Sequence, residues 1–229
     1  MQKPKVVILT GAGISAESGI PTFRGVDGLW EGHRIEDVAS PEGFLRDPET
    51  VQRFYNTRRA DVRKARPNAG HLALVALERK FDVHIITQNI DDLHERAGSK
   101  NVLHLHGEIM KSQSSSDPQK VYVIKGDDIR MGDLCPAGAQ LRPHVVWFGE
   151  SVPNMKEAIK LTNAADVFIV IGTSLQVYPA ANLIFETKKE CEIYLIDPNA
   201  STLNVGKRVV LINETACAAV PELVKMLTK

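Results

Sequence analysis

The chain is long enough to bury one good core and a small second lobe, and its charges cancel. It has 229 residues, of which 43% are hydrophobic, and 28 basic residues balance 28 acidic ones. This balance gives no reason to expect binding to nucleic acid or to a membrane. The apolar runs are no longer than strands and the first residues carry no signal segment, so we expect a cytoplasmic protein, and a monomer.

Short apolar segments alternate with helical patterns along most of the chain. The expected strands are residues 5–9, 83–87, 102–105, 145–148, 167–171, 192–196 and 208–212. The expected helices are residues 68–80, 154–164, 179–189 and 216–227. Near-continuous apolar strands that alternate with helices predict an α/β fold, in which a Rossmann-like parallel sheet has helices on both faces.

Two segments depart from this alternation. Residues 25–66 are helical in pattern, and residues 111–142 are polar, with one strand-like piece at 121–125. We expect both to be insertions that build a smaller lobe within a single domain, with a ligand cleft between that lobe and the strand ends. The larger lobe then takes the remaining residues, about 1–24, 67–110 and 143–229.

The first strand ends abruptly at a glycine-rich turn, Gly11-Ala12-Gly13. Glycine lets the backbone approach a phosphate, and the start of the following helix favours negative charge, so the turn predicts a dinucleotide site. A dehydrogenase has a third glycine three places after the second, where this chain has Ala16. Hydride transfer is therefore the least favoured function.

A second strand ends in the same way, at Gly172-Thr173-Ser174. Further along, another strand ends at Asp197-Pro198-Asn199. An acid about 20 residues after a glycine turn is the usual partner of a ribose hydroxyl. The sequence thus predicts a dinucleotide that lies across two glycine turns.

Polar side chains follow the strand at 83–87. Gln88, Asn89 and Asp91 place two amides and a carboxylate on one turn. Amides suit another amide, such as nicotinamide, because each can both donate and accept hydrogen bonds. The alternative is that Asn89 and Asp91 only cap the next helix, but the nearby glycine turn favours ligand contact.

Two histidines share one face of the strand at 102–105 and its end. His106 comes last, against a glycine, where it can serve as a general base because its ordinary pKa is near neutrality. His104 is expected to be structural. A later strand, after Pro143, ends in Gly149-Glu150 and offers an edge for an extended peptide, unless it is simply a buried strand that ends there.

Tyr55 and Arg58 lie on the apolar face of a helix that begins after Asp47. An arginine within an apolar stripe is costly unless it meets an anion. Tyr55 is three residues before it, so both side chains can converge on one carboxylate. The alternatives are an arginine that reaches solvent or one that pairs with a nearby Asp or Glu.

Five motifs in this order along nearly the whole chain resemble those of the sirtuins, which are NAD-dependent protein deacylases. The motifs are residues 11–15 with 19–24, 87–91, 106–107, 148–150 and 172–174. The resemblance, with the acid-ended strand, implies an NAD site made of Gly11, Ala12, Gly13, Ser15, Phe23, Arg24, Gln88, Asn89, Ile90, Asp91, Gly172, Thr173, Ser174, Asp197, Pro198, Asn199, Ala216 and Cys217.

The resemblance also implies a reaction, in which the acyl group passes from lysine to ADP-ribose and nicotinamide is released. His106 would be the base that activates a ribose hydroxyl, while Asn89 and Asp91 would hold the nicotinamide and its ribose. The acylated lysine of a protein or peptide would be received by Val146, Phe148, Gly149 and Glu150. The pair Tyr55 and Arg58 resembles that of the subgroup that removes succinyl and malonyl groups, so we expect those activities, with room for deacetylation.

The chain departs from the family at its zinc ribbon. Sirtuins usually have two cysteine pairs between the catalytic histidine and the peptide strand, whereas Cys135 is the only cysteine in that stretch. One thiolate cannot hold a tetrahedral zinc, so we expect a ribbon remnant and no metal. Two other functions stay open at this point: ADP-ribosyl transfer or NAD hydrolysis, and a non-catalytic NAD-sensing module.

Overall fold

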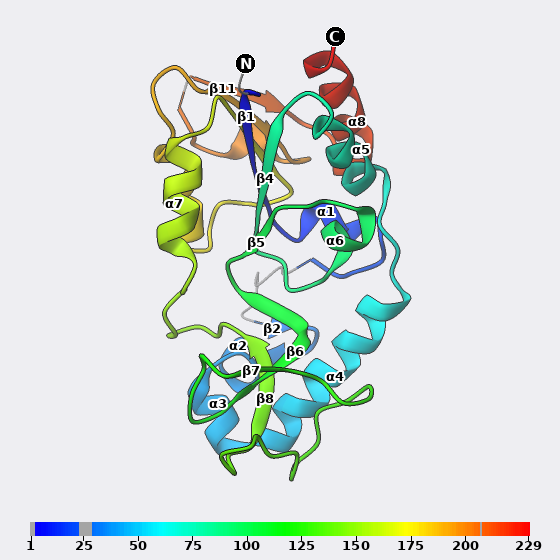
Figure 1. Ribbon diagram of the computed structural model, residues 1–229, viewed down its shortest axis with the longest axis vertical. Helices are drawn as coiled ribbons and strands as arrows, with labels where there is room; N and C mark the ends of the chain where they lie inside the picture. The colour runs from blue at the N-terminus through cyan, green and yellow to red at the C-terminus, as the bar shows by residue number, and fades with distance from the viewer. Residues whose placement is uncertain (1–2, 23–28, 207) are drawn as a thin grey trace.

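A six-stranded parallel sheet, in the order β11-β10-β9-β1-β4-β5, forms the larger half of the molecule (Figure 1). The computed structural model describes residues 3–22, 29–206 and 208–229. The strands are β1 Lys5–Thr10, β4 Asp82–Thr87, β5 Val102–His104, β9 Val167–Ile171, β10 Glu192–Ile196 and β11 Val209–Ile212. The α/β fold predicted from the alternating pattern is confirmed.

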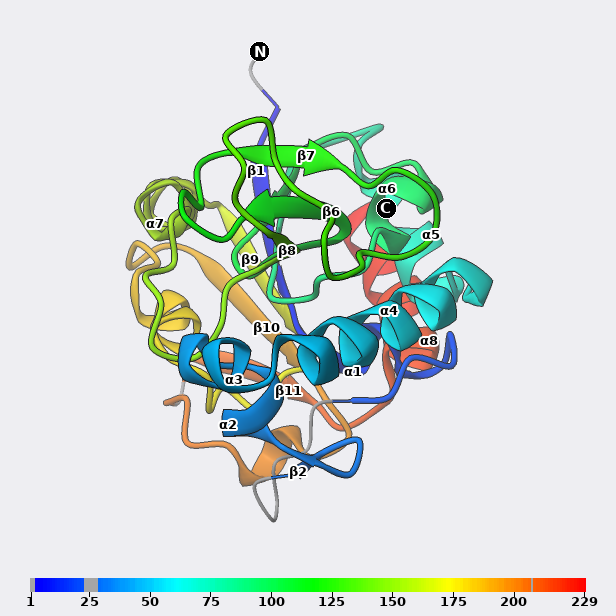
Figure 2. The same cartoon turned by 90° about the horizontal axis from the view of Figure 1, so that it is seen from below.

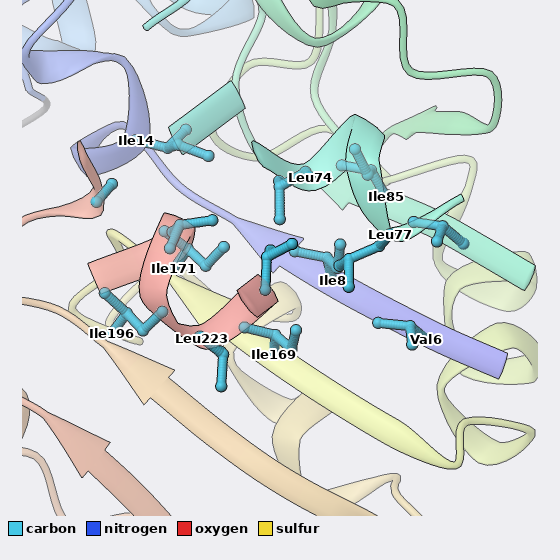
Figure 3. Close-up of a cluster of buried hydrophobic side chains, with 14 of the residues drawn as sticks. Val6, Ile8, Ile14, Leu74, Leu77, Ile85, Ile169, Ile171, Ile196 and Leu223 are labelled. Carbon is cyan, nitrogen blue, oxygen red and sulfur yellow. The ribbon is translucent and has the colours of Figure 1, made fainter. Parts of the chain in front are cut away.

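Helices cover both faces of this sheet because its strands are apolar on both sides. Val6 and Ile8 of β1 pack with α5 and α8 on one face (Figure 3). Val7 and Leu9 pack with α7 and η1 on the other face. In the described part of the chain, no helix has the length and apolar character needed to cross a bilayer. The helices of this half are α1 Gly13–Ala16, α5 Ala69–Leu77, α6 Leu93–Ala97, α7 Met155–Asn163, α8 Ala216–Leu227 and the 3₁₀ helices η1 Ala180–Phe185 and η2 Ala200–Thr202.

The smaller half lies at the carboxyl ends of the parallel strands, where Figures 1 and 2 show helices beside a three-stranded antiparallel sheet. Its long helix α4 starts cleanly because the Asp47 side chain accepts a hydrogen bond from the Thr50 N–H and Pro48 occupies the first turn. A third apolar core joins this helix to the sheet. The elements are β2 Leu29–Trp30, β3 His33–Arg34, α2 Ile35–Val38, α3 Pro41–Arg46, α4 Pro48–Lys64, β6 Gly107–Ser114, β7 Val121–Val123 and β8 Leu141–Val145.

Two expected elements are wrong, and one strand and one hairpin were not predicted. The strand expected at 145–148 is β8, which ends at Val145 and contains Pro143; the proline is tolerated because β8 is an edge strand. Strand β6 was missed because its buried side chains include Ser112 and Gln113, which have no apolar pattern. The helix expected at 179–189 is the short 3₁₀ helix η1. The 25–66 segment also holds the β2–β3 hairpin, which its helical pattern did not predict.

Candidate active site

The two glycine turns lie in direct contact at the carboxyl ends of β1 and β9. The Gly11 N–H donates to the Ile171 carbonyl at 3.0 Å, and the Gly13 N–H donates to the Gly172 carbonyl at 2.8 Å. A Cβ on Gly13 would lie 2.6 Å from the Gly172 Cα, and Gly172 has a left-handed φ of 63°. Glycine is thus required here for the approach of one turn to the other, before any ligand is considered.

A buried hydrogen-bonded chain connects the first turn to the residues after β4. The Asn89 amide donates to Ser15 Oγ at 3.2 Å, and Ser15 Oγ donates to Asp91 Oδ2 at 3.0 Å. The other oxygen of Asp91 accepts from the Leu93 N–H at 3.1 Å, so the capping alternative holds for that oxygen. Burial raises the pKa of Asp91, although the bonds from Leu93 and Ser15 oppose the shift. Ser15, Asn89 and Asp91 therefore form one connected polar cluster.

His106 is oriented by a neighbouring backbone group. Its Nδ1 lies 3.0 Å from the Gln88 carbonyl, which can only accept, so Nδ1 carries the hydrogen. Nε2 of the neutral ring is then the basic nitrogen, and burial lowers the pKa of His106, which keeps the ring neutral. The Gln88 amide in turn donates to Thr173 Oγ1 at 3.2 Å, which ties this segment to the second glycine turn.

His104 supports this segment from behind, as expected. Its Nδ1 lies 3.0 Å from the Asn89 carbonyl, and its Nε2 lies 2.8 Å from Glu95 Oε1. Burial lowers the pKa of His104, but the contacts with Glu95 outweigh it and the net shift is upward. The His104 ring thereby fixes the backbone of Asn89.

The expected peptide strand starts beside the expected base. The Val146 N–H donates to the His106 carbonyl at 2.9 Å, and the backbone then turns outward at Gly149, where φ is 90°. The Glu150 carboxylate has an internal role that sequence reasoning missed: it accepts from the Trp147 N–H at 2.8 Å and pairs with Arg142. It thereby fixes the turn that the peptide would meet.

A cavity lies between Asp91 of this polar cluster and helix α4. Its walls include Ile90 and Asp91 on one side and Trp30, Glu31 and Arg58 on the other. Figure 1 shows the start of α4 near the three-stranded sheet and its end near α6 of the larger half, where the Arg96 guanidinium donates to the Val62 carbonyl at 3.0 Å. The cavity lining thus includes two residues of the predicted cofactor site, Ile90 and Asp91, together with Arg58.

Arg58 lies at this cavity and Tyr55 lies behind it. The Arg58 guanidinium stacks over the Phe54 ring, at 3.6 Å from its centroid, and forms an ion pair with Glu31. Tyr55 has no exposed surface, and its hydroxyl accepts from the Trp147 indole N–H at 3.1 Å; burial raises its pKa. The alternative of an arginine paired with a nearby acid is therefore what the structure shows in this state.

The residues expected around the adenine end have local partners. Asp197 Oδ1 accepts from the Asn199 N–H at 2.8 Å, and Pro198 and Ser174 are exposed. The Cys217 N–H donates to Glu17 Oε2 at 3.1 Å, and Ala216 is buried. Glu17 was missed because it meets Cys217 only in the folded chain. Phe23 and Arg24 lie outside the described residues.

Serines surround the single cysteine of the ribbon remnant. Cys135 Sγ donates to Ser114 Oγ at 3.5 Å, and that hydroxyl lies 3.0 Å from Ser116 Oγ. Within the described ranges, no three His, Cys, Asp or Glu side chains are grouped so as to hold a metal ion. These side chains do not fit a tetrahedral zinc, since one thiolate is the only soft ligand. A metal-free lobe stays a prediction.

These features define a class: an α/β dinucleotide-binding protein whose polar ligands follow the strand ends. The Sir2 family model matches residues 11–179. An NAD-dependent protein deacylase of Aggregatibacter actinomycetemcomitans is 58% identical over 200 residues, which cover 87% of this chain and 96% of the relative. One from Helicobacter pylori is 53% identical over 222 residues, which cover 97% of this chain and 96% of the relative.

Solved structures agree with these relatives. A Sir2 homologue in complex with NAD is 41% identical, with a TM-score of 0.87 over 99% of this chain and 90% of the other. A Sir2 mutant with a deacetylated p53 peptide and 3′-O-acetyl ADP-ribose is 32% identical, with a TM-score of 0.78 over 99% of this chain and 93% of the other. The chain belongs to the Sir2 family, and it is an NAD-dependent protein deacylase.

Proposed function

We propose that this deacylase removes acidic acyl groups, succinyl and malonyl, from lysine side chains. One observation carries the proposal: the Arg58 guanidinium lines the same cavity as Ile90 and Asp91. An acyl group that enters from the expected lysine position would pass these residues before it reached the guanidinium. A carboxylate at the end of a short acyl chain is the anion that this cation can recognise.

The state of Arg58 supports a ligand role. Its side chain is only 16% exposed, its Nη1 donates to the Phe54 carbonyl at 3.0 Å, and its buried Nε has no hydrogen-bond partner among the described residues. Burial lowers the pKa of Arg58, with Glu31, Tyr55 and Asp61 opposing the shift. A desolvated donor without a partner is costly, and an acyl carboxylate would satisfy it.

The chain's residues fit NAD, because the polar side chains of Ser15, Asn89 and Asp91 gather at the strand ends in a fold shared with a Sir2 homologue that binds NAD. When bound, NAD would supply the ribose carbon to which the acyl oxygen bonds as nicotinamide leaves, and the ribose hydroxyl to which the acyl group passes as the lysine is released. We propose that Asn89 and Asp91, fixed by Ser15, orient the nicotinamide and its ribose. His106 Nε2 would take a proton from a ribose hydroxyl, since its Nδ1 is committed to the Gln88 carbonyl.

We propose the same NAD contacts for the other expected residues. Backbone groups of the two turns would face the diphosphate, and the segments at 197–199 and 216–217 would face the adenine end. Val146, Phe148 and Gly149 would receive the peptide backbone, with Glu150 holding their turn. We further propose that the enzyme works as a metal-free cytoplasmic monomer without nucleic acid or membrane, on the basis of its balanced charge and single ribbon cysteine.

The test compares matched acetyl-, succinyl- and malonyl-lysine peptides of one sequence, with products identified by mass. A charge-assisted hydrogen bond contributes about 1.5–3 kcal/mol, so Arg58→Met should lower kcat/KM on succinyl-lysine by about 10- to 150-fold. Acetyl-lysine should be affected far less. Arg53→Met is the matched control, because Arg53 is exposed on the same helix and bonds only to Thr50 among the described residues.

The outcomes separate the candidate functions. Equal losses on the acetyl and succinyl peptides would refute the role of Arg58. Deacylated peptide with acyl-ADP-ribose supports the proposal. ADP-ribosylated protein, or hydrolysed NAD alone, would support the transferase or hydrolase alternative, and no turnover of any peptide would support an NAD-sensing module.

A further inference from the structure

The turn of the β2–β3 hairpin contains a residue that its backbone does not favour. Trp30 pairs with His33, so Glu31 and Gly32 form a two-residue loop, and both have left-handed φ angles, 51° and 78°. Such loops favour Asn or Asp followed by glycine. A glutamate there incurs a steric cost that Asn or Gly would avoid, so turn geometry does not explain this side chain.

The Glu31 side chain is directed at the cavity beside Arg58 and Asp91, which we call the acyl cavity. Its Oε2 lies 3.2 Å from Arg58 Nη2, and both side chains line the cavity. Asp61 lines the same cavity, but its carboxylate pairs with Lys64 at 3.5 Å. Glu31 therefore supplies the carboxylate that contacts the guanidinium within the described part of the chain.

This contact uses half of a two-donor edge. Nε and Nη2 of a guanidinium point the same way and together bind a carboxylate with two parallel hydrogen bonds. In Arg58, Nη2 is held by Glu31, whereas the buried Nε has no partner among the described residues. Nη1 is already committed to the Phe54 carbonyl. The edge that a substrate carboxylate needs is thus partly occupied.

We propose that Glu31 is the specificity-determining residue of this cavity, because its carboxylate competes with the acyl carboxylate of the substrate for the Nε–Nη2 edge of Arg58. This inference rests on the proposed function. Glu31 is 37% exposed, so its side chain can turn to solvent when a succinyl group arrives. Acetyl-lysine carries no carboxylate, so it does not compete with Glu31 and leaves the ion pair with Arg58 in place.

The test is Glu31→Gln, assayed with matched succinyl- and acetyl-lysine peptides at saturating NAD. A competing pair lowers apparent affinity by the fraction of Arg58 that is free, about two- to fivefold for a partly exposed ion pair. The KM for the succinyl peptide should therefore fall by about two- to fivefold, while the KM for the acetyl peptide stays unchanged. Glu31→Asn should do the same and keep the hairpin, since Asn tolerates the left-handed turn.

Two further variants make the result specific. Glu36→Gln is the matched control, because Glu36 lies just after the same hairpin and pairs with the exposed Arg34 rather than with Arg58. It should leave both KM values as in the wild type. In the Arg58→Met background, Glu31→Gln should no longer change the KM for succinyl-lysine.

The competition model is overturned if Glu31→Gln and Glu31→Asn raise the KM for succinyl-lysine, since Glu31 would then be a clamp that positions Arg58. It is also overturned if both acyl peptides change alike, or if the effect persists without Arg58. Failure of the proposed function itself has a different signature: Arg58→Met alone would leave the ratio of succinyl to acetyl turnover unchanged.

Discussion

Gly13→Ala tests whether the floor of the site depends on the contact between the two glycine turns. The new Cβ would lie 2.6 Å from the Gly172 Cα and 2.9 Å from its carbonyl oxygen, whereas carbon atoms in contact are about 3.5–4.0 Å apart. The turns must separate by roughly 1 Å. Overpacking costs about 1–3 kcal/mol, and alanine's better helix propensity returns up to about 1 kcal/mol.

We therefore expect the variant to be less stable by about 1–2 kcal/mol, which lowers Tm by about 2–8 °C in a chain of this size. The same displacement moves the backbone that would face NAD, and a misplacement of about 1 Å can cost about 100-fold in kcat/KM. The measurements are thermal unfolding and kcat/KM for NAD at saturating acyl peptide.

Gly132→Ala is the control for this prediction. Unlike Gly13, Gly132 has a left-handed φ, 92°, and a Cβ there would meet nothing within 4 Å. Gly132→Ala should lower the free energy of unfolding by about 1–2 kcal/mol through backbone strain, and it should leave kcat/KM for NAD unchanged. A Gly13→Ala enzyme with wild-type kinetics toward NAD would show that the contact between the turns does not shape the cofactor site.

Three other predictions follow from the site. His106→Asn should lower kcat by about 10²- to 10⁴-fold, because the general base is lost. In the wild type, protonation of His106 removes the base, and burial lowers the pKa of His106, so the acid limb of kcat/KM should have its midpoint below pH 6.5. A midpoint above that value would contradict the burial argument. Glu150→Gln should destabilise the fold by about 1–3 kcal/mol, because it weakens the partner of the buried Arg142, and should raise KM for acetyl and succinyl peptides alike; a loss for one acyl group only would count against this role. Treatment with a zinc chelator should leave Tm unchanged, and elemental analysis that finds one zinc per chain would refute the metal-free lobe around Cys135.

The parts of the fold that repeat locally could be predicted from the sequence. Strands such as Val167–Ile171 are apolar on both faces, and β1, β9 and β4 are followed by Gly11, Gly172 and Gln88, which places the site at one edge of the sheet. Strand β6 has no such pattern, because its buried Gln113 and Ser114 bond to other polar groups instead of packing in an apolar core. Its pairing with β8 therefore had no local signal.

The site shows the same division between local and long-range information. Spacing alone placed Tyr55 and Arg58 on one face of a helix, but it could not show that Tyr55 bonds to Trp147 or that Arg58 meets Glu31 across the hairpin. Nor could spacing show that the Glu150 carboxylate, expected as a substrate contact, also bonds to Trp147 and Arg142 within the fold. Partners that are distant in sequence are set by tertiary packing, which a motif does not record.

The acyl cavity and the cofactor floor are built by separate pieces of chain. The proposed floor is mainly backbone from the turns after β1 and β9, whereas the cavity walls include side chains of α4 and the β2–β3 hairpin, with Ile109 of β6 and the segment at 20–21. The two meet at Ile90 and Asp91. Substrate range can therefore diverge among descendants of this enzyme, or be altered in the laboratory by a library confined to positions such as 30, 31 and 62, while the machinery that handles the nucleotide is inherited intact.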